Sequence, residues 1–376
     1  MINRKNCTGC GACADQCPKG AITLRNDENG CLIPQIDQEK CIGCDLCERA
    51  CPKEHERQNS AFKQRYFAAF NPDLRIRCKS TSGGVFSVWM EHFMKNGGYV
   101  AGVILDEEVK ARYVLTKDPA VCDRIRKSKY VQAYPDGIYC KIKQKLDAGA
   151  HVLFAGLPCQ VHALKLYLGK EYERLLTVDL ICFGVVPPAV FEDYIKDKEK
   201  KTGKKITDFV FRGRDEIKGW HKNCFIAGYA DGTEEKVRQS TDYYFGVFFK
   251  NIAIRDSCFV CRYKTASREG DITLGDFWGI EKVAPEMDSN DGVSVMTINT
   301  EKGNCLFEKV KGGIEYKELF ENVLNFSSTT RNNKPYKFRK AFLKAYRKRG
   351  FSYACFWHVS VYRLLSKIPL LKLIYK

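Results

Sequence analysis

The feature that most constrains this chain is a pair of four-cysteine runs within its first 51 residues. Both runs follow the pattern C-x2-C-x2-C-x3-C-P. Thiolates two residues apart on a tight turn reach three corners of one iron–sulfur cubane, and the fourth cysteine ligates the other cubane. We therefore expect two [4Fe-4S] clusters, one held by Cys7, Cys10, Cys13 and Cys51, and the other by Cys41, Cys44, Cys47 and Cys17.

Zinc bound by the same thiolates is the alternative, but zinc ribbons use pairs of cysteines and not runs of four. Gly9, Gly11 and Gly43 allow backbone amides to approach the sulfurs. The chain begins MINRKNCTGC, without an apolar segment typical of a secretion signal. With 19 cysteines in 376 residues, we expect metal-bound thiols in a reducing cytoplasm and not disulfides.

Beyond residue 60 the pattern changes to alternating helices and strands. Apolar spacing and Gly stops predict the following order: a hairpin at 21–33, a helix at 85–96, a strand at 99–105, a helix at 138–147, a strand at 151–155, a helix from about 161 and a strand at 175–181. This order favours an α/β sheet that is parallel at least in part. Residues 206–300 read as an appended, more irregular β region of short strands and Gly turns.

Four regions follow from this reading. We expect a ferredoxin-type domain with two clusters at 1–60, an α/β domain divided into 61–150 and 151–325, and a basic helical tail at 326–376. The fold class is thus a bacterial-ferredoxin-like domain followed by an α/β domain with an irregular β region.

Several motifs beyond the cysteine runs occur in a characteristic order. They are Ser80-Thr81-Ser82-Gly83-Gly84, Ser128-Lys129-Tyr130-Val131-Gln132, Gly156-Leu157-Pro158-Cys159-Gln160, Asp179-Leu180-Ile181-Cys182, Cys258-x2-Cys261, and Asp271 through Gly279 with the sequence DITLGDFWG. In this order the chain resembles the family of coenzyme F-420 hydrogenase/dehydrogenase beta subunits, in its bacterial branch with an N-terminal ferredoxin module.

The resemblance implies an iron–sulfur flavoprotein oxidoreductase. Family members bind FAD and pass electrons between [4Fe-4S] clusters and a small-molecule redox substrate, which in archaeal relatives is the deazaflavin coenzyme. Some bacterial relatives occur with polysaccharide-synthesis enzymes. The competing hypothesis is a non-catalytic electron-relay subunit of a larger complex, and either function calls for a redox protein partner. No residue is singled out as catalytic.

Four further cysteines are candidates for a third [4Fe-4S] cluster. Cys159 and Cys182 follow two predicted strands, and ligands of open α/β sheets gather at the carboxyl ends of strands. The CxxC pair Cys258 and Cys261 would complete four thiolates. The alternative is that Cys159 and Cys182 are small buried apolar residues.

The flavin contacts follow from the resemblance and the local pattern together. Ser82, Gly83 and Gly84 precede a helix and can present amides to a phosphate, although a helix cap without a ligand is the alternative. Ser128 and Lys129 are also assigned to the cofactor, where Lys129 neutralises a pyrophosphate or reduced flavin; the alternative is a solvated lysine. No GxGxxG follows a strand, so a Rossmann-type site is not supported.

Two positions depart from the family pattern. The family commonly has His-Gly after the cysteine of the LIC motif, and here Phe183-Gly184 follows Cys182. The family also often has Gly before Ser-Lys-Tyr, and here that residue is Lys127. A missing histidine that moves protons or shapes the pocket would change the reaction, so the substrate does not transfer from relatives.

The net charge of +17 is concentrated at the C-terminus. Residues 331–376 contain 13 Lys and Arg and no Asp or Glu, which leaves +4 for the first 330 residues. Aromatic and leucine residues alternate with these charges, which predicts either an interfacial helix on an anionic membrane surface or an amphipathic helix packed on its own domain or on a partner subunit. We expect no nucleic-acid partner and a cytoplasmic protein, peripheral at the inner face of the membrane if the tail binds it.

Overall fold

The computed structural model describes residues 6–57, 60–215, 219–320 and 331–361 of the 376-residue chain. Its N-terminal module contains two short helices, α1 (Ala12–Gln16) and α2 (Leu46–Arg49), and the antiparallel hairpin of β1 (Ile22–Asn26) and β2 (Leu32–Ile36). The Asp27 carboxylate accepts hydrogen bonds from the amides of Asn29 and Cys31 at 2.9 Å and so fixes the hairpin turn. The predicted hairpin and the ferredoxin-like N-terminal region are confirmed.

An eight-stranded mixed sheet forms the body of the molecule. Its order is β13 (Glu315–Leu319), β3 (Arg65–Phe70), β12 (Ser294–Ile298), β11 (Ile272–Asp276), β7 (Leu175–Leu180), β6 (Val152–Gly156), β4 (Tyr99–Leu105) and β5 (Ala111–Thr116). The four strands β11, β7, β6 and β4 are parallel, and the outer pairings are antiparallel. The mixed α/β expectation is therefore confirmed, with the parallel strands at the centre.

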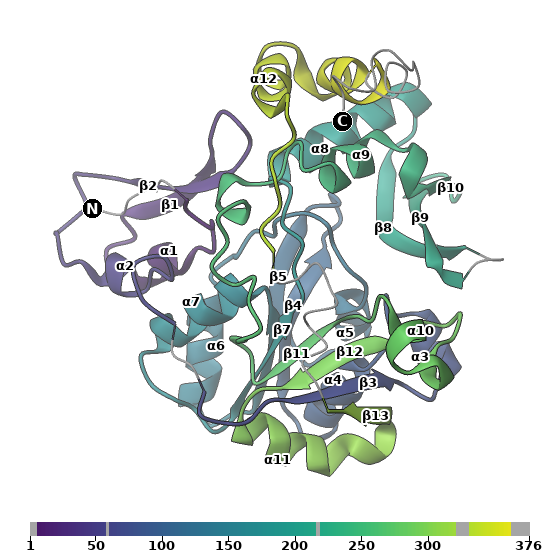
Figure 1. The fold of residues 1–376 in the computed structure, drawn as a ribbon. Helices are drawn as coiled ribbons and strands as arrows, with labels where there is room; N and C mark the ends of the chain where they lie inside the picture. Colours follow the sequence, from purple (N-terminus) through teal and green to yellow (C-terminus); the bar gives the residue numbers. More distant parts are fainter. Residues whose placement is uncertain (1–5, 58–59, 216–218, 321–330, 362–376) are drawn as a thin grey trace.

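Helices cover both faces of this sheet (Figure 1). One face carries α4 (Phe86–Lys95), α5 (Pro119–Ile125) and α11 (Glu301–Val310), whose buried side chains share a hydrophobic cluster with the sheet. The other face carries α6 (Ile138–Asp147) and α7 (Pro158–Leu168). Because β6 and β7 are parallel neighbours, the loops that follow them lie at the same end of a sheet that is covered on both faces.

The irregular β region is only partly as predicted. Strands β8 (Ile206–Asp215), β9 (Gly219–Tyr229) and β10 (Glu234–Arg238) form a separate antiparallel sheet. In contrast, β11 and β12 also fall within 206–300 but are inserted into the main sheet, β11 parallel to β7. The expectation of one appended region was wrong here, because short apolar strands carry no sequence signal for the strand with which they pair.

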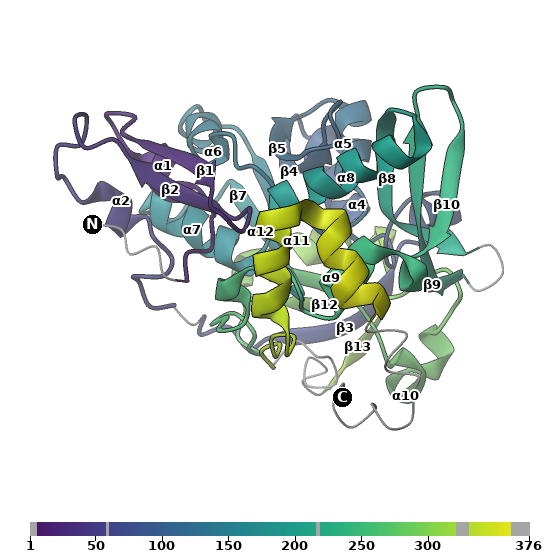
Figure 2. The same ribbon diagram turned by 90° about the horizontal axis from the view of Figure 1, so that it is seen from above.

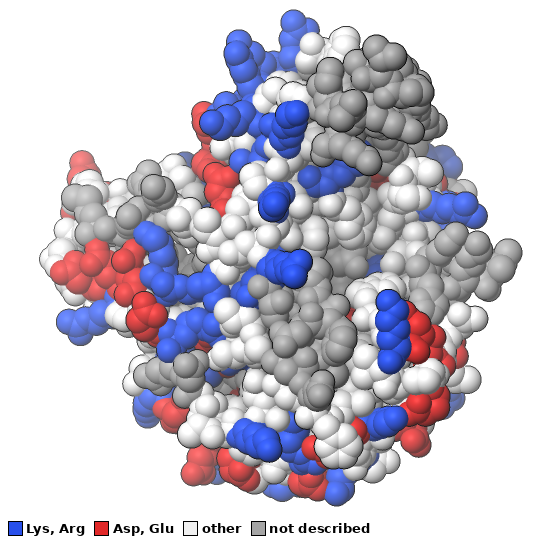
Figure 3. Space-filling view, viewed as in Figure 1, with Lys and Arg blue, Asp and Glu red and all other residues white. Residues whose placement is uncertain are grey.

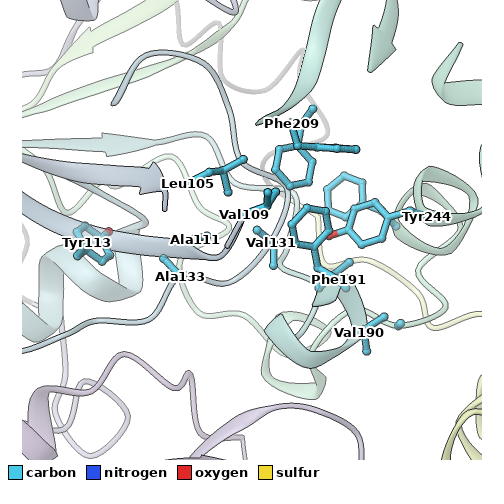
Figure 4. Packing of buried hydrophobic residues seen from close by; sticks show 14 of the residues in the cluster. Leu105, Val109, Ala111, Tyr113, Val131, Ala133, Val190, Phe191, Phe209 and Tyr244 are labelled. Atoms are coloured by element: carbon cyan, nitrogen blue, oxygen red, sulfur yellow. The ribbon is translucent and has the colours of Figure 1, made fainter. Parts of the chain in front are cut away.

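An aromatic core joins the small sheet to the main body. Helix α8 (Pro188–Thr202) and helix α9 (Tyr243–Phe249) pack against β8, and Figure 4 shows the rings of Phe191, Phe209 and Tyr244 gathered beside Val109 and Val131. The ring centroids of Phe191 lie 5.5 Å from Phe209 and 5.2 Å from Tyr244. The two sheets therefore share one continuous hydrophobic cluster.

The basic C-terminal region forms helix α12 (Arg339–Cys355), which lies over α8 and α9 (Figure 2), followed by a π-helical turn (Phe356–Val361). Phe342, Phe351 and Ala354 are buried, and Tyr346 donates a hydrogen bond to Asp193 of α8 at 2.8 Å. This part of the predicted tail thus packs on its own domain, while residues 362–376 lie outside the described residues. Of the helices in the described ranges, none has the length and apolar character needed to cross a bilayer.

Candidate functional site

The first expected cluster set is brought together in the N-terminal module. A cavity of about 20 Å³ is lined by all four of its cysteines, Cys7, Cys10, Cys13 and Cys51. Burial raises the pKa of Cys10 to about 12 and raises the pKa of Cys13 further, and neighbouring thiols of the same set add to both shifts. Residues from both sequence runs therefore meet around one space, as the spacing predicts.

Backbone amides reach the sulfurs of this module. The Gly9 amide donates to Cys7 Sγ at 3.3 Å, and the Ala21 amide donates to Cys17 Sγ at the same distance. Gly9 has a φ of +65°, which favours glycine. The amide hydrogens present partial positive charge to the sulfurs and so favour the deprotonated, metal-binding form of the thiols.

The second expected set lies at the outer edge of the module. Cys17 and Cys47 pack into one small apolar cluster, and burial together with the charges of Glu48 and Cys17 raises the pKa of Cys47. Cys41 and Cys44 lie on the exposed turn that leads into α2. This set is therefore the more solvent-exposed of the two.

The third expected set surrounds a larger cavity between the module and the main sheet. The cavity has a volume of about 300 Å³ and is lined by all four candidates, Cys159, Cys182, Cys258 and Cys261. Cys159 is the second residue of α7, and Cys182 lies two residues after β7. Since β6 and β7 are parallel neighbours, the segments after them converge as expected.

Local structure fixes the position of Cys159. The Gln160 side chain accepts a hydrogen bond from the Leu157 amide at 2.9 Å and one from the Tyr113 hydroxyl at 2.7 Å. Pro158 occupies the first turn of α7, where its missing N–H has no cost. The start of the helix is therefore held against β5, and the thiol faces the cavity.

The thiols of this set influence one another. Burial raises the pKa of Cys159 well above its usual value, with further contributions from Cys261, Cys182, Cys10 and Cys258. Burial also raises the pKa of Cys182 to about 12. Within the described part of the chain, no three His, Cys, Asp or Glu side chains converge on a site for a single metal ion. A cubane places each thiolate on a different iron, so its ligands need not converge in that way.

The two cavities are adjacent. Thr8, Pro52 and Lys53 line both of them. Tyr263, also on the wall of the larger cavity, donates to the Pro52 carbonyl at 3.4 Å and lies 3.0 Å from His162 Nδ1. Burial lowers the pKa of His162 to about 4, so this imidazole is neutral at neutral pH. The cysteine sets are thus neighbours across a single layer of residues.

Arg255 and Gln132 clamp the first cysteine loop to the main body. Buried Arg255 donates to the carbonyls of Cys7 at 2.7 Å and Leu32 at 2.8 Å, and to Gln132 Oε1 at 2.8 Å. Gln132 Nε2 in turn donates to the Gly9 carbonyl at 3.0 Å. Sequence reasoning missed this role: Gln132 ended a recognised motif, but an arginine before a CxxC pair carries no signal of its own.

A second attachment holds the end of the module. Arg57 pairs with Glu269 and donates to the Ser267 carbonyl at 2.6 Å and to Thr265 Oγ1 at 2.8 Å. Arg57 and Glu269 are both largely shielded from solvent. The module is therefore anchored to the segment that connects Cys261 to β11.

The segments assigned to the flavin also meet. The Ser128 amide donates to Thr81 Oγ1 at 2.7 Å, which joins the 80–84 loop to the 126–129 loop. Several of the local donors already have protein partners, because the Gly83 amide donates to Ser294 Oγ at 3.0 Å and Ser82 Oγ donates to the Val293 carbonyl at 2.9 Å. These contacts give Ser82 and Gly83 a structural role against β12, while the N-cap of α4 is Val85. Gly84, with a φ of +77°, starts the turn into α4.

Lys129 has a structural role in the described fold. Its Nζ donates to the carbonyls of Arg124, Ile125 and Arg126 at 2.7–3.0 Å, at the C-terminus of α5. Burial lowers its pKa to about 7. All three donors of the ammonium are thus used by backbone acceptors, so the expected contact with a pyrophosphate stays a prediction.

An aromatic surface extends from the third cysteine set towards these loops. The Phe183 ring lies 5.2 Å from Phe248, which stacks on Tyr130 at 5.0 Å, and Phe249 is 49% exposed beside them. Burial raises the pKa of Tyr130, which also interacts with Arg212. A planar ligand that stacks on this surface would lie between Cys182 and the 126–129 loop.

Asp276 has a structural role. Its carboxylate pairs with buried Arg212. The guanidinium of Arg212 lies 5.1 Å from the Trp278 ring, and Trp278 stacks on Trp220 with centroids 4.6 Å apart. Among the described residues, Arg212 Nη2 has no hydrogen-bond partner. The pair therefore ties β8 to the end of β11.

Comparisons with known proteins agree with the motif order. Residues 6–55 match the 4Fe-4S dicluster domain, and residues 149–321 match the C-terminal part of the coenzyme F420 hydrogenase/dehydrogenase beta subunits. One subunit of the F(420)H(2) dehydrogenase of Methanosarcina mazei is 25% identical over 197 residues, which is 48% of this chain and 54% of that protein. An uncharacterized ferredoxin of Methanocaldococcus jannaschii is 50% identical over 30 residues, 8% of this chain and 39% of that protein.

A chain from the structure of the F420-reducing [NiFe] hydrogenase complex of Methanosarcina barkeri aligns with 82% of this chain and 94% of its own length, at 16% identity and a TM-score of 0.44. The chain spans about half the length, or less, of the curated relatives that it matches. The resemblance inferred from the motifs is confirmed. Residues 149–321 are similar to the C-terminal region of the coenzyme F420 hydrogenase/dehydrogenase beta subunits, and a 4Fe-4S dicluster domain precedes this region.

Proposed function

We propose that this protein is an iron–sulfur flavoprotein oxidoreductase that acts on a small-molecule redox substrate. The observation that carries the proposal is the adjacency of two cysteine-lined cavities that share Thr8, Pro52 and Lys53. A lone ferredoxin module would need no second set of four cysteines on the domain against which it docks. The substrate, and the link to polysaccharide synthesis that the resemblance implies, stay predictions.

The cysteine sets fit three [4Fe-4S] clusters. The first and third sets each line a cavity, and the second lies at the exposed edge of the module, so its members would be the ligands nearest a redox partner. When bound, the clusters supply one-electron transfer and a flavin supplies two-electron chemistry. Arg255 and Gln132 hold the first set against the third, which keeps the separation between them constant.

FAD fits the aromatic surface better than it fits the loops alone. Phe249 and Tyr130 offer stacking area next to Phe183. We assign the flavin ring to this surface. The 80–84 and 126–129 loops stay the expected phosphate contact, but the Ser82 hydroxyl, the Gly83 amide and the Lys129 ammonium donate to protein acceptors and would have to exchange them for the phosphates. A Tyr130→Ala variant should therefore release flavin, whereas Tyr353→Ala, an exposed aromatic on α12, should retain it.

The decisive experiment is anaerobic purification followed by analysis of iron, sulfide and released flavin. Three cubanes require about 12 iron per chain, and loss of one leaves about 8. The double variant Cys258→Ser/Cys261→Ser should lose the third cluster only. Cys122→Ala is the matched control, because Cys122 is buried in the hydrophobic cluster on the opposite face of the sheet. About 8 iron and no flavin in the unmodified chain would refute the third cluster and favour the electron-relay alternative.

The redox partner should dock at the second cysteine set. Residues 6–55 contain eight Asp and Glu against five Lys and Arg, in contrast to the rest of this basic chain. Figure 3 shows acidic side chains gathered over α2, and Ile42 is 60% exposed between Cys41 and Cys44. A one-electron carrier with a basic face fits this surface. The rate of electron transfer between this carrier and the protein should fall steeply as the ionic strength rises. At low ionic strength it should also be slower in the Asp45→Lys variant.

The outer face of α12 fits an anionic membrane surface. Lys340, Lys344 and Lys348 are exposed, and Trp357 is 50% exposed just beyond the helix. Figure 3 shows basic side chains over this part of the molecule. Deleting the whole tail would also remove buried Phe342, so the sharper test replaces the three lysines with Glu, which reverses their charge. Loss of flotation with vesicles of anionic phospholipid is expected, and unchanged flotation would refute the contact.

A further inference from the structure

Lys264 is a buried cation on the wall of the cavity that contains the third cysteine set. It is 8% exposed, and its Nζ donates to Asn333 Oδ1 at 3.0 Å. The same Nζ lies 5.5 Å from the centroid of the Phe183 ring, and Asn333 Nδ2 donates to the Phe183 carbonyl at 2.7 Å. Neutral groups therefore hold the ammonium in place without neutralising it.

The other cations on this wall are largely compensated or engaged elsewhere. Arg268 lies 3.3 Å from the Asp179 carboxylate, and Lys53 lies 3.2 Å from that of Glu54. Arg262 points towards the module, where it donates to the His55 carbonyl at 2.7 Å and lies 3.9 Å from the Glu56 carboxylate. Among the described residues of this wall, Lys264 and Arg255 thus remain as cations without a carboxylate partner.

The charged groups around the cysteine sets differ. The cavity of the third set is lined by Lys264 together with Arg255 and Arg268. Among the described residues that line the cavity of the first set, Lys53 is the one charged residue, and it pairs with the Glu54 carboxylate at 3.2 Å. A cluster bound to the third set would therefore have the more positive surroundings.

A reduced cluster carries one more negative charge than an oxidised one. A nearby cation therefore stabilises the reduced state and raises the reduction potential, and a nearby carboxylate lowers it. The effect is strongest for a charge that is shielded from water, as Lys264 is.

We propose that Lys264 raises the reduction potential of the third cluster above those of the two N-terminal clusters. Electrons that reach the N-terminal module are then drawn inward, one at a time: the donor cluster loses one electron, the third cluster gains it, and no bond forms or breaks. This inference rests on the proposed function, because it requires the third cluster. It assigns the chain the role of a reductase of its small-molecule substrate.

The test is an anaerobic redox titration of the holoprotein, followed by electron paramagnetic resonance. In Lys264→Met the equilibrium constant for reducing the third cluster should fall at least tenfold, which is about 59 mV for a one-electron couple. The potentials of the N-terminal clusters should stay unchanged. Lys264→Arg keeps the charge and should restore most of the shift.

Two further variants separate charge from structure. Asn333→Asp leaves Lys264 in place but pairs it with a carboxylate, so it should lower the potential in the same direction. Lys165→Met removes a cation from α7 that donates to the Glu269 carbonyl at 2.6 Å and does not line the cavity, so the potential should not move. A purely structural role for Lys264 predicts iron loss without a change in the potential of the remaining clusters.

The outcomes distinguish this inference from the proposed function. About 12 iron per chain with an unchanged potential in both Lys264→Met and Asn333→Asp overturns the inference alone. A third cluster whose potential lies below those of the N-terminal pair also overturns it. About 8 iron in the unmodified protein overturns the third cluster, and the inference with it.

Discussion

The junction between the cysteine module and the main body should be unusually sensitive to a single methyl group at Gly9. A Cβ on Gly9 would overlap Gln132 Nε2, and it would lie 2.7 Å from the Leu32 carbonyl oxygen and 2.8 Å from Arg255 Nη1. These three groups form the clamp that holds the first cysteine loop. In Gly9→Ala the clamp must therefore move.

The size of the effect follows from the contacts that break. An L-residue in the left-handed conformation costs about 1 kcal/mol. Loss of the neutral bond from Gln132 to the Gly9 carbonyl costs about 1 kcal/mol, and loss of the charged bond from Arg255 to Gln132 about 2 kcal/mol. The free energy of opening the junction should thus fall by about 4 kcal/mol, which corresponds to roughly a thousandfold larger equilibrium constant for opening.

Amide hydrogen exchange on the anaerobic holoprotein measures this opening. The reporters are the amides of Gln132 and Arg255, which donate to the carbonyls of Val186 at 2.9 Å and Val185 at 3.0 Å. Both should exchange about a thousandfold faster in Gly9→Ala if exchange follows the opening equilibrium. Iron content should fall as well, because the first cysteine set loses its support.

Gly20→Ala is the matched control within the same module. Gly20 also has a positive φ, +58°, but a Cβ there would meet nothing within 4 Å. Backbone strain alone then predicts a loss of about 1 kcal/mol in the free energy of unfolding and little change in amide exchange at the junction. Equal exchange rates in Gly9→Ala and Gly20→Ala would refute the clamp as the source of the effect.

Three further predictions concern the surroundings of the site. Because the pKa of His162 is lowered to about 4, the histidine takes up its proton at a higher pH in the unfolded chain than in the folded one. The free energy of unfolding should therefore drop by about 3 kcal/mol between pH 6.5 and 4. A urea midpoint that shifts by the same amount over this pH range in His162→Gln would contradict this. Gln160→Leu removes the acceptor of the Leu157 amide and should cost about 2 kcal/mol, with loss of iron from the third set only; unchanged iron would argue against this helix start as its support. Arg57→Ala leaves buried Glu269 unpaired and should destabilise by about 3 kcal/mol in urea unfolding, and rescue by Glu269→Gln in the same chain would support the pairing.

The sequence by itself determined the metal chemistry. Spacing within each cysteine run is local, so it reports directly which thiols can share a cubane, and the structure brings Cys51 to the set of Cys7 as that spacing requires. The main helices and strands were predictable for the same reason, since apolar periodicity is a local property. Strand 99–105 and helix 138–147 match β4 and α6 in full.

Only the tertiary structure decided which segments meet. Strands β11 and β12 could be recognised as strands but not assigned to the main sheet, because pairing depends on partners distant in the sequence. The convergence of Cys159, Cys182 and the CxxC pair on one cavity was an inference from strand ends, and the fold was needed to bring them together.

The clamp of Arg255, the free charge of Lys264 and the occupied donors of Lys129 had no sequence signal at all. A lysine or arginine reads the same in sequence whether it is solvated, caps a helix or faces a buried cavity, because its role is set by what lies within a few ångströms of its charged atoms. The structure gives Lys129 three backbone carbonyls and leaves Lys264 beside four thiols. The cysteine runs therefore determined which metal groups the chain can hold, and the tertiary structure determined which charges surround them.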